Sequence, residues 1–378
     1  MASAEKQKSV IFLRQVQDKK RRPDVTSAAS GLSMNRREIA AAREISVVMP
    51  VYNDGGFLPA AVESLVAQDC PGVEIIIVDD GSTDASAETA EKCLGNFPGG
   101  RVIRLRRSGI VTALNTGIAA ASGRYIARMD ADDICLPGRL RLQKEFLDDH
   151  PDIGLVSCLV SFGGSRQEAR GYAAYVDWVN SIRSDSEIRL NRFIESPIPH
   201  PSVMFRRGLV GRYGGYRQGD FPEDYELWLR WLAAGVKMEK LPEHLLQWND
   251  RPERLSRRSR RYSVRSFYRC KAQYLAGWLA ANNPRYPKIT ILGAGRKTRQ
   301  RAEMLGVHGI EIESYVDVDP RKAGRVCQGR PVFSDREPGR LAGAFMVSFV
   351  GSRGAREQIR RWLAEQRFRE GTDYIIAA

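Results

Sequence analysis

The segment RYIARMDADD (residues 124–133) joins a short apolar run to three carboxylates within four positions. The apolar part is typical of the end of a buried strand. Like charges this close repel one another unless a cation or hydrogen-bond donors offset them. A hard divalent cation does so while it keeps coordination positions open for phosphate oxygens. The segment therefore predicts a strand that ends in a cation-binding acidic cluster.

Strand-like and helix-like patterns alternate along the chain up to this segment. Runs rich in β-branched residues predict buried strands, and apolar residues at helical spacing predict helices between them. Such alternation predicts a mostly parallel sheet with helices on both faces. The strands are predicted at 45–52, 73–80, 101–105 and 123–129, and the helices at 58–68, 85–94 and 110–121.

Polar residues follow three of these predicted strands and would meet at one edge of the sheet. In open α/β sheets, ligands bind beyond the carboxyl ends of the strands. Taken singly, acidic loop residues are also turn formers or helix caps, and Asp84 fits a cap. The strand-end residues are Tyr52, Asn53 and Asp54, then Asp79 and Asp80, then Asp130, Asp132 and Asp133.

The length and composition of the chain exclude several classes of protein. Its 378 residues, 43% of them hydrophobic, suffice for two domains with ordinary cores. No uncharged apolar run reaches the roughly 18 residues needed to span a bilayer, and no signal-peptide pattern is found. The six cysteines are scattered without C-x-x-C spacing, which argues against a zinc site or a disulfide framework. We therefore expect a cytoplasmic protein.

Two basic segments contribute to the net charge of +14, which favours polyanionic partners such as anionic lipids or phosphate-bearing substrates. Residues 1–44 are basic with little apolar periodicity, which predicts a disordered tail. Residues 251–286 begin with RPERLSRRSRRYS and predict a basic helical connector. Its basic face is either a solvated helix face or a membrane-surface patch.

Five segments resemble the family 2 glycosyltransferases, which are inverting enzymes of the GT-A fold. The resemblance covers residues 45–249 and implies a GT-A glycosyltransferase domain over residues 45–250. Another class with a similar nucleotide-binding sheet, the sugar-nucleotide pyrophosphorylases, has a Gly-rich basic loop near the first strand that is missing here. The matching segments, in the family's order, are ISVVMPVYND, VEIIIVDDGSTD, RSGIVTALNTGIAAASGRYIARMDADD, HPSVMFRR and EDYELWLRW.

The resemblance implies a subsite for the base of the donor nucleotide. Tyr52 matches the aromatic position that lies against the base, where a flat ring can stack. Asp80 matches the carboxylate that accepts a hydrogen bond from the uracil imide. This implies a UDP-sugar donor, although a dTDP-sugar presents the same group.

The resemblance also assigns roles within the acidic cluster. Asp130 and Asp132 match the two ends of the family's D-x-D motif, with Asp132 as the metal ligand and Asp130 near the ribose. Mg²⁺ or Mn²⁺ would bridge the diphosphate and stabilise its charge as it leaves. Asp133 is expected to hydrogen-bond beside the ligands. Arg139 also has a counterpart in the family, and its alternatives are donor contact and a structural ion pair.

The segment FPEDYELWLRWL (221–232) marks the acceptor side. By themselves, Glu223 and Asp224 fit first-turn carboxylates favoured by a helix dipole. The resemblance implies a general base at this position, so Asp224 takes that role and Glu223 that of a substrate-orienting neighbour. His200 matches a family position near the site, with a structural histidine as the alternative.

A strand and helix pattern restarts at residue 287 and predicts a second, smaller Rossmann-like α/β domain over residues 287–378. Gly293 and Gly295 lie between its first strand and helix, and Asp317 or Asp319 ends the next strand, where a dinucleotide ribose would bind. Two glycines in such a turn are a weak signal. NAD(P) binding is therefore the less favoured alternative to a scaffold or partner-binding role.

The combined expectation is a metal-dependent inverting glycosyltransferase of the hexosyltransferase type, in cell-envelope or surface-glycan biosynthesis. It would move a sugar from a nucleotide-sugar to a hydroxyl of a glycan or lipid-linked acceptor. Its basic segments allow peripheral contact with the inner face of the membrane, whereas nucleic acid is not a favoured partner.

Two alternatives stay open at this point. One is a bifunctional sugar-modifying enzyme with an NAD(P)-using C-terminal domain, although no Tyr-x-x-x-Lys pair occurs there. The other is a polyanion-binding protein with a retired catalytic fold.

Overall fold

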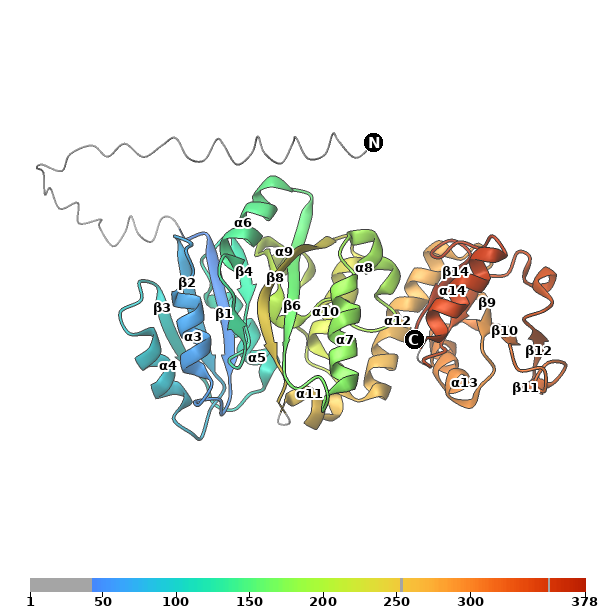
Figure 1. Cartoon of the computed structure of the whole chain (residues 1–378), viewed down its shortest axis with the longest axis horizontal. Helices are drawn as coiled ribbons and strands as arrows, with labels where there is room; N and C mark the ends of the chain where they lie inside the picture. Colours follow the sequence, from blue (N-terminus) through green and yellow to red (C-terminus); the bar gives the residue numbers. More distant parts are fainter. Residues whose placement is uncertain (1–42, 252–253, 353) are drawn as a thin grey trace, which may run out of the picture. The chain divides into compact units, whose positions relative to one another are not determined.

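The computed structural model describes residues 43–251, 254–352 and 354–378 (Figure 1). The predicted basic tail, residues 1–44, lies almost wholly outside the described residues. The described part contains a larger and a smaller β-sheet, and a long helix connects them along the chain. The larger sheet contains the strands that the sequence predicts, and its edge carries the candidate site.

Four parallel strands form one half of the larger sheet, in the order β3-β2-β1-β4. Their residues are buried almost throughout in β1, β2 and β4, as the apolar runs predict for a sheet covered on both faces. The register pairs Val51 with Asp79, so the first two strands end level with each other. The four strands are β1 (Ile45–Val51), β2 (Val73–Asp79), β3 (Gly100–Arg104) and β4 (Tyr125–Arg128).

The other half of the larger sheet continues in the order β7-β6-β8-β5 and mixes strand directions. β7 pairs antiparallel with both β4 and β6, whereas β6 and β8 run parallel. β8 also pairs antiparallel with β5, which directly follows the acidic cluster, so the end of β8 returns to that cluster. These strands are β5 (Ile134–Cys135), β6 (Ile153–Gly163), β7 (Met204–Arg206) and β8 (Lys237–Asn249).

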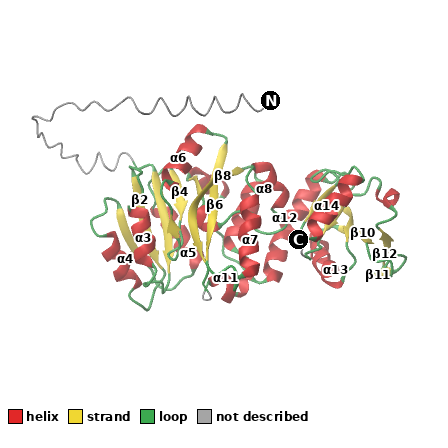
Figure 2. Ribbon diagram, viewed as in Figure 1, coloured by secondary structure: helices red, strands yellow, loops and turns green. Residues whose placement is uncertain are grey.

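Helices cover both faces of the larger sheet (Figure 2). Successive side chains of a strand point to opposite faces, so Val47 packs under one helical layer and Val48 under the other. One layer contains α3 (Leu58–Val66), α4 (Ser86–Leu94), α6 (Arg139–Asp149) and α7 (Arg170–Ser181). The other contains α5 (Ile110–Ala120), α8 (Asp185–Asn191), α9 (Gly208–Tyr213) and α10 (Glu223–Ala233).

The smaller sheet has the strand order β11-β12-β10-β9-β13-β14. The strands from β12 to β14 in this order run parallel, and the short β11 pairs antiparallel with β12. Numbered from β9, the parallel strands stand in the order 3-2-1-4-5, as in doubly wound nucleotide-binding sheets. The strands are β9 (Lys288–Leu292), β10 (Glu311–Asp317), β11 (Val326–Cys327), β12 (Arg330–Ser334), β13 (Met346–Ser348) and β14 (Tyr374–Ile376), with α13 (Arg296–Ala302) and α14 (Ala355–Glu365) among the helices.

The connector consists of α11 (Leu255–Arg258), the 3₁₀ turn η2 (Arg260–Tyr262) and the long helix α12 (Val264–Asn282). One hydrophobic core contains residues of α10, α12 and the smaller sheet, among them Tyr225 and Leu275. The core is therefore continuous across residues 250 and 286, where domain boundaries are predicted. Near these positions β8 ends at Asn249 and β9 begins at Lys288.

Gly117 in α5 tests how tightly the helices pack on the larger sheet. A Cβ atom at this position would lie 2.5 Å from Cγ1 of Val48, whereas a Cβ at Gly277 in α12 would meet nothing within 4 Å. Alanine favours both helices, but at Gly117 the steric cost of about 1 to 3 kcal/mol outweighs the helical gain of about 0.5 to 1 kcal/mol. We expect urea unfolding to show that Gly117→Ala destabilises the protein and that Gly277→Ala stabilises it. Equal effects of the two changes would contradict this packing.

Candidate active site

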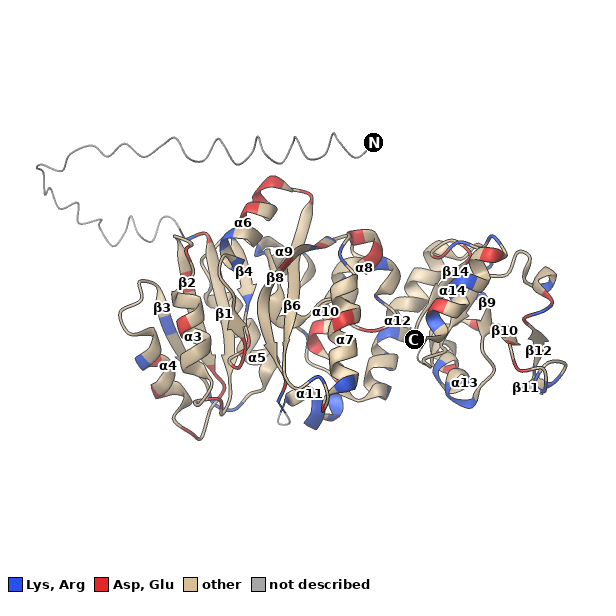
Figure 3. Cartoon of the chain, viewed as in Figure 1, with Lys and Arg blue, Asp and Glu red and all other residues tan. Residues whose placement is uncertain are grey.

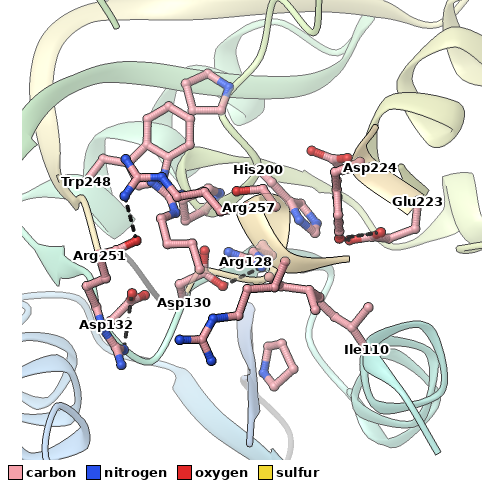
Figure 4. A pocket seen from close by; sticks show the side chains of 18 of the residues that line it. Ile110, Arg128, Asp130, Asp132, His200, Glu223, Asp224, Trp248, Arg251 and Arg257 are labelled. Carbon is pink, nitrogen blue, oxygen red and sulfur yellow. Dashed lines mark hydrogen bonds and ion pairs between the residues drawn. The ribbon is translucent and has the colours of Figure 1, made fainter. Parts of the chain in front are cut away.

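A cavity of about 980 Å³ lies at the carboxyl edge of the larger sheet (Figure 4). It is lined by residues from the strand ends, from the first turn of α10 and from the connector. The edge predicted from the strand-end residues is therefore the place where the candidate residues meet. The predicted residues that line the cavity are Tyr52, Asp80, Asp130, Asp132, His200, Glu223 and Asp224.

One end of the cavity contains Tyr52, Asp80 and Arg107. The Arg107 guanidinium lies over the Tyr52 ring, 3.4 Å from its centroid, and pairs with the Asp80 carboxylate. Asp80 is 2% exposed and also accepts hydrogen bonds from the backbone N–H groups of Ser108, at 2.7 Å, and Gly109, at 2.9 Å. This end therefore offers an aromatic face, a planar cation and a fixed carboxylate, which suit a flat, hydrogen-bonding ligand.

The acidic cluster at the end of β4 brings three carboxylates together. One ligand atom from each of Asp130, Asp132 and Asp133 lies within 4.8 Å of the others. Burial and then the Asp130 charge raise the pKa of Asp132 to about 6, and the same two causes raise that of Asp133 well above its usual range. Asp133 accepts a hydrogen bond from the backbone N–H of Asn249 at 2.8 Å, and its buried Oδ2 has no partner among the described residues.

These features fit a divalent cation. The cluster supplies only oxygen ligands, as Mg²⁺ and Mn²⁺ prefer, and positive charge would relieve the repulsion that raises the two pKa values. Residues Asp130 and Asp132 line the cavity, so a bound ion could also reach a ligand there. Asp133 is 0% exposed and lies behind them.

Arginines that were not predicted as site residues lie beside the cluster. Nη2 of Arg128 lies 2.5 Å from Oδ1 of Asp130. Nη1 of Arg251 lies 2.7 Å from Asp54 and 3.4 Å from Asp132. A signal was present, because Arg251 lies two residues after the end of β8 and begins the basic connector. Nothing in the sequence, however, shows that β8 ends beside the cluster.

The connector also contributes Arg254 to the wall of the cavity. Its guanidinium lies 4.9 Å from the ring centroids of both Tyr172 and Trp248, and it donates a hydrogen bond to the Tyr172 hydroxyl. Tyr172, Tyr175 and Trp248 form an aromatic group along this wall. The wall beside the connector therefore combines arginines with aromatic surface.

Glu223 and Asp224 begin α10, as the sequence predicts. Both line the cavity, and Glu223 is 1% exposed. Oδ1 of Asp224 accepts a hydrogen bond from the N–H of Tyr225 at 2.7 Å. Burial and then the neighbouring Glu223 charge raise the pKa of Asp224 to about 7. A carboxylate with this pKa can accept and release a proton near neutral pH.

His200 and Arg139 have different surroundings. His200 lines the cavity, and its Nε2 lies 2.6 Å from the Tyr216 hydroxyl. Burial and the Arg128 charge lower the pKa of His200 well below its usual value, which keeps the ring neutral. Arg139 is 0% exposed in the core, where it donates hydrogen bonds to the carbonyl of Arg128 at 2.7 Å and to Gln143 at 3.2 Å. Among the described residues its hydrogen-bond partners are therefore neutral core groups, and it does not line the cavity, so this structure shows neither the donor contact nor the ion pair predicted for Arg139.

The predicted residues of the smaller sheet lie elsewhere. Gly293 has a φ of +92° in the turn after β9, and Gly295 precedes α13. The Asp317 carboxylate accepts a hydrogen bond from the N–H of Ala294 at 2.7 Å and pairs with Lys322 at 3.0 Å. Its oxygens therefore hold the turn together in this structure, and nucleotide binding by this unit stays a prediction.

The family model for glycosyl transferase family 2 matches residues 46–214. An uncharacterized glycosyltransferase of Haemophilus influenzae is 31% identical over 207 residues, which cover 54% of this chain and 74% of that protein. The UDP-Gal:alpha-D-GlcNAc-diphosphoundecaprenol beta-1,3-galactosyltransferase of Escherichia coli is 27% identical over 235 residues, which cover 61% and 82%.

The crystal structure of S. aureus TarS residues 1–349 in complex with UDP-GlcNAc resembles this chain with a TM-score of 0.51 at 19% identity, covering 69% of this chain and 70% of that one. This likeness shows the fold, which is of the GT-A type. The chain belongs to glycosyl transferase family 2. The predicted family and the predicted GT-A type of the larger sheet are thereby confirmed, whereas the Rossmann-like character of the second unit stays a prediction.

Replacing Asp132 by asparagine tests the cation site without a donor. Because the folded state raises the pKa of Asp132, its ionised form costs stability at pH 7, and the cost disappears as pH falls towards about 4. We expect Asp132→Asn to stabilise the chelator-treated protein by about 1 kcal/mol or more at pH 7 and to abolish stabilisation by Mn²⁺. Urea unfolding with and without Mn²⁺ measures both effects. The exposed Asp177, paired with Arg166, provides the control variant Asp177→Asn, and an Mn²⁺ response retained in Asp132→Asn would contradict the site.

Proposed function

We propose that this family 2 glycosyltransferase is a metal-dependent inverting enzyme that moves a hexose from a UDP-sugar to an acceptor hydroxyl. One observation carries the proposal. A single cavity contains an acidic cluster suited to a divalent cation and, on a different element, a separate buried carboxylate whose pKa is raised towards neutrality. Carboxylates in two such environments can perform different tasks in one reaction.

The nucleotide end of the donor would lie at Tyr52, Asp80 and Arg107. The Tyr52 ring can stack on a base, and Asp80 can accept a hydrogen bond from the N–H of uracil. Because Arg107 now covers the ring and pairs with Asp80, a base would displace its guanidinium or stack beside it. The relative from Escherichia coli is named for a UDP-Gal donor, which supports the choice of a UDP-sugar.

The diphosphate would lie at the acidic cluster and its arginines. Asp132, with Asp130 and Asp133, would hold Mg²⁺ or Mn²⁺, which supplies positive charge to the departing diphosphate. Arg251 and Arg254 carry further positive charge to the same part of the cavity. These guanidinium groups can donate to phosphate oxygens once the donor competes with their present partners.

Asp224 would remove the proton from the acceptor hydroxyl as that oxygen attacks the anomeric carbon. The bond from the anomeric carbon to the diphosphate oxygen breaks as the bond to the acceptor oxygen forms, so a single displacement inverts the configuration. The ionised form of Asp224 is the active one. Burial and then the neighbouring Glu223 charge raise its pKa, which makes it a stronger base than an exposed aspartate.

The acceptor side is bordered by the aromatic group Tyr172, Tyr175 and Trp248, whose rings suit the apolar faces of a sugar. Basic residues also gather at α11, next to the cavity (Figure 3). A lipid-linked acceptor with a diphosphate would fit these features, and the relative from Escherichia coli is named for such an acceptor. We therefore propose a role in surface-glycan assembly with peripheral contact to an anionic membrane. None of the helices in the described ranges has the length and apolar character needed to cross a bilayer.

A panel of nucleotides tests the donor class. Ligands that bind only the folded state raise its stability according to their affinity. We expect UDP and UDP-hexoses to raise the melting temperature when Mn²⁺ or Mg²⁺ is present, and CDP, which lacks the imide N–H, to do so far less. A thermal shift assay with chelator controls measures this. Stronger stabilisation by GDP-sugars than by UDP-sugars would contradict the proposed UDP-sugar donor.

Replacing Asp224 by asparagine tests the base. The amide keeps the shape of the side chain but cannot take up the proton, so kcat for transfer should fall by about 100-fold or more at unchanged donor affinity. In the unaltered enzyme, kcat should rise with pH through about 7 as Asp224 loses its proton. The control is Asp220→Asn, in the loop before α10 and outside the cavity lining. Near-normal transfer by a folded Asp224→Asn variant would contradict this mechanism.

A further inference from the structure

The first turns of α10 are held by three side chains from the connector. The Tyr262 hydroxyl donates to Glu223, the Phe267 ring lies 5.4 Å from the Tyr225 ring, and the Tyr274 hydroxyl lies 2.5 Å from Oε1 of Glu226. The sequence predicts a helical connector whose basic face is either solvated or a membrane-surface patch. In the structure the connector also packs against α10, whose second residue, Asp224, is the proposed base.

Tyr262 is the member of this set whose hydroxyl reaches the carboxylate beside the base. Its oxygen lies 2.8 Å from Oε1 and 2.7 Å from Oε2 of Glu223. Nη1 of Arg261 adds a longer ion pair to the same carboxylate, at 3.5 Å. Both Tyr262 and Glu223 line the cavity, and Glu223 is 1% exposed, so water does not replace these contacts. Figure 4 shows Glu223 and Asp224 side by side at this end of the cavity.

The position of Tyr262 is fixed by the helix that follows it. α12 is anchored by Lys271, whose buried Nζ donates to the carbonyls of Phe193 and Ile194 at 2.7 Å and to that of Ala377 at 3.3 Å. The last of these residues follows β14 of the smaller sheet. Packing against the smaller sheet therefore fixes the position of α12. Because η2 lies directly before α12, this packing also fixes the position of Tyr262.

A hydroxyl that donates to a buried carboxylate has two effects. It fixes the rotamer of that carboxylate, and it favours the ionised form. Ionised Glu223 is in turn one of the causes that raise the pKa of Asp224. Loss of the hydroxyl would leave Glu223 buried with a single, longer ion pair, which favours its neutral form and removes its charge from beside Asp224.

We propose that Tyr262 is a positioning residue for sugar transfer, which the connector delivers to the active site and which acts on Asp224 through Glu223. This inference rests on the proposed function, because it takes Asp224 as the base. Through Tyr262, the connector and the smaller sheet would support catalysis even if the smaller sheet binds no nucleotide. A purely structural hydrogen bond is the alternative, and Tyr274 provides the comparison.

The experiment compares Tyr262→Phe with Tyr274→Phe. Each change removes one hydroxyl that the connector donates to a buried glutamate of α10, but Tyr274 does not line the cavity. We expect Tyr262→Phe to lower kcat by about 10-fold, the scale of a displaced catalytic group, with the donor KM within about twofold. Tyr274→Phe should retain kcat even if it lowers the melting temperature as much.

The pH profile of kcat separates positioning from stability. In Tyr262→Phe, Glu223 holds its proton more readily, so Asp224 ionises at lower pH and the acid limb should move to lower pH. Glu223→Gln should move the limb the same way, and adding Tyr262→Phe to it should cause no further shift, because the two residues act in one chain. Tyr274→Phe should not move it. Besides Glu223, the titratable and charged groups that act on Asp224 or respond to it are Arg128, Tyr175, Tyr216, Tyr262 and Cys270.

Each outcome decides between the proposals. Wild-type kcat and an unmoved acid limb in Tyr262→Phe, with transfer lost in Asp224→Asn, would overturn the positioning role and keep the base. An equal loss of kcat in Tyr262→Phe and Tyr274→Phe without a shift of the limb would also overturn it, in favour of a structural bond. Near-normal transfer by Asp224→Asn would overturn the proposed base and the positioning role together.

Discussion

Three carboxylates at the end of β4 lie close enough for their oxygens to share one ion. Asp133 is fully buried, and Asp130 and Asp132 are partly buried, which limits the solvent that would screen their repulsion. Much of the surrounding structure supplies positive charge against this repulsion. Arg128 pairs with Asp130 from within the same segment, and Arg251 reaches Asp132 from the end of β8. The raised pKa of Asp132 shows that the compensation is incomplete. Such stored electrostatic cost is typical of sites built to bind a ligand of opposite charge.

The cavity keeps its acidic residues in two different environments. Asp130 and Asp132 face arginines, whereas Asp224 lies at the start of α10, where burial and Glu223 dominate its pKa. Arg128 acts on both groups, because its charge pairs with Asp130 and lowers the pKa of Asp224. One group of carboxylates is thus suited to remain charged beside a cation, while the other is suited to exchange a proton.

A continuous hydrophobic core joins the smaller sheet to α10 through α12, so the second unit supports the helix that begins beside the cavity. α12 buries apolar side chains against both α10 and the smaller sheet, and Lys271 joins it to carbonyls on either side. A buried amine has lost its hydrating water and needs hydrogen-bond acceptors from the protein. The carbonyls of Phe193, Ile194 and Ala377 are these acceptors for Lys271, so they hold α12 in place. The first turn of α10 therefore rests on packing that extends well beyond the glycosyltransferase domain predicted from the sequence.

The sequence by itself determined the four parallel strands, the edge at which their ends meet and the start of α10 at Glu223, because strand periodicity, helix spacing and strand-end chemistry are local. Five short segments also sufficed to indicate the family. The partners of those residues were decided only by tertiary structure. Arg251 and Asp54 meet although 197 positions separate them, and Arg107, Arg254 and Tyr262 reach the cavity from segments whose patterns fit solvated loops and helices. The burial of Arg139 was likewise decided by tertiary structure. Its guanidinium donates to the carbonyl of Arg128 in β4, and no local sequence pattern shows that this acceptor lies beside it.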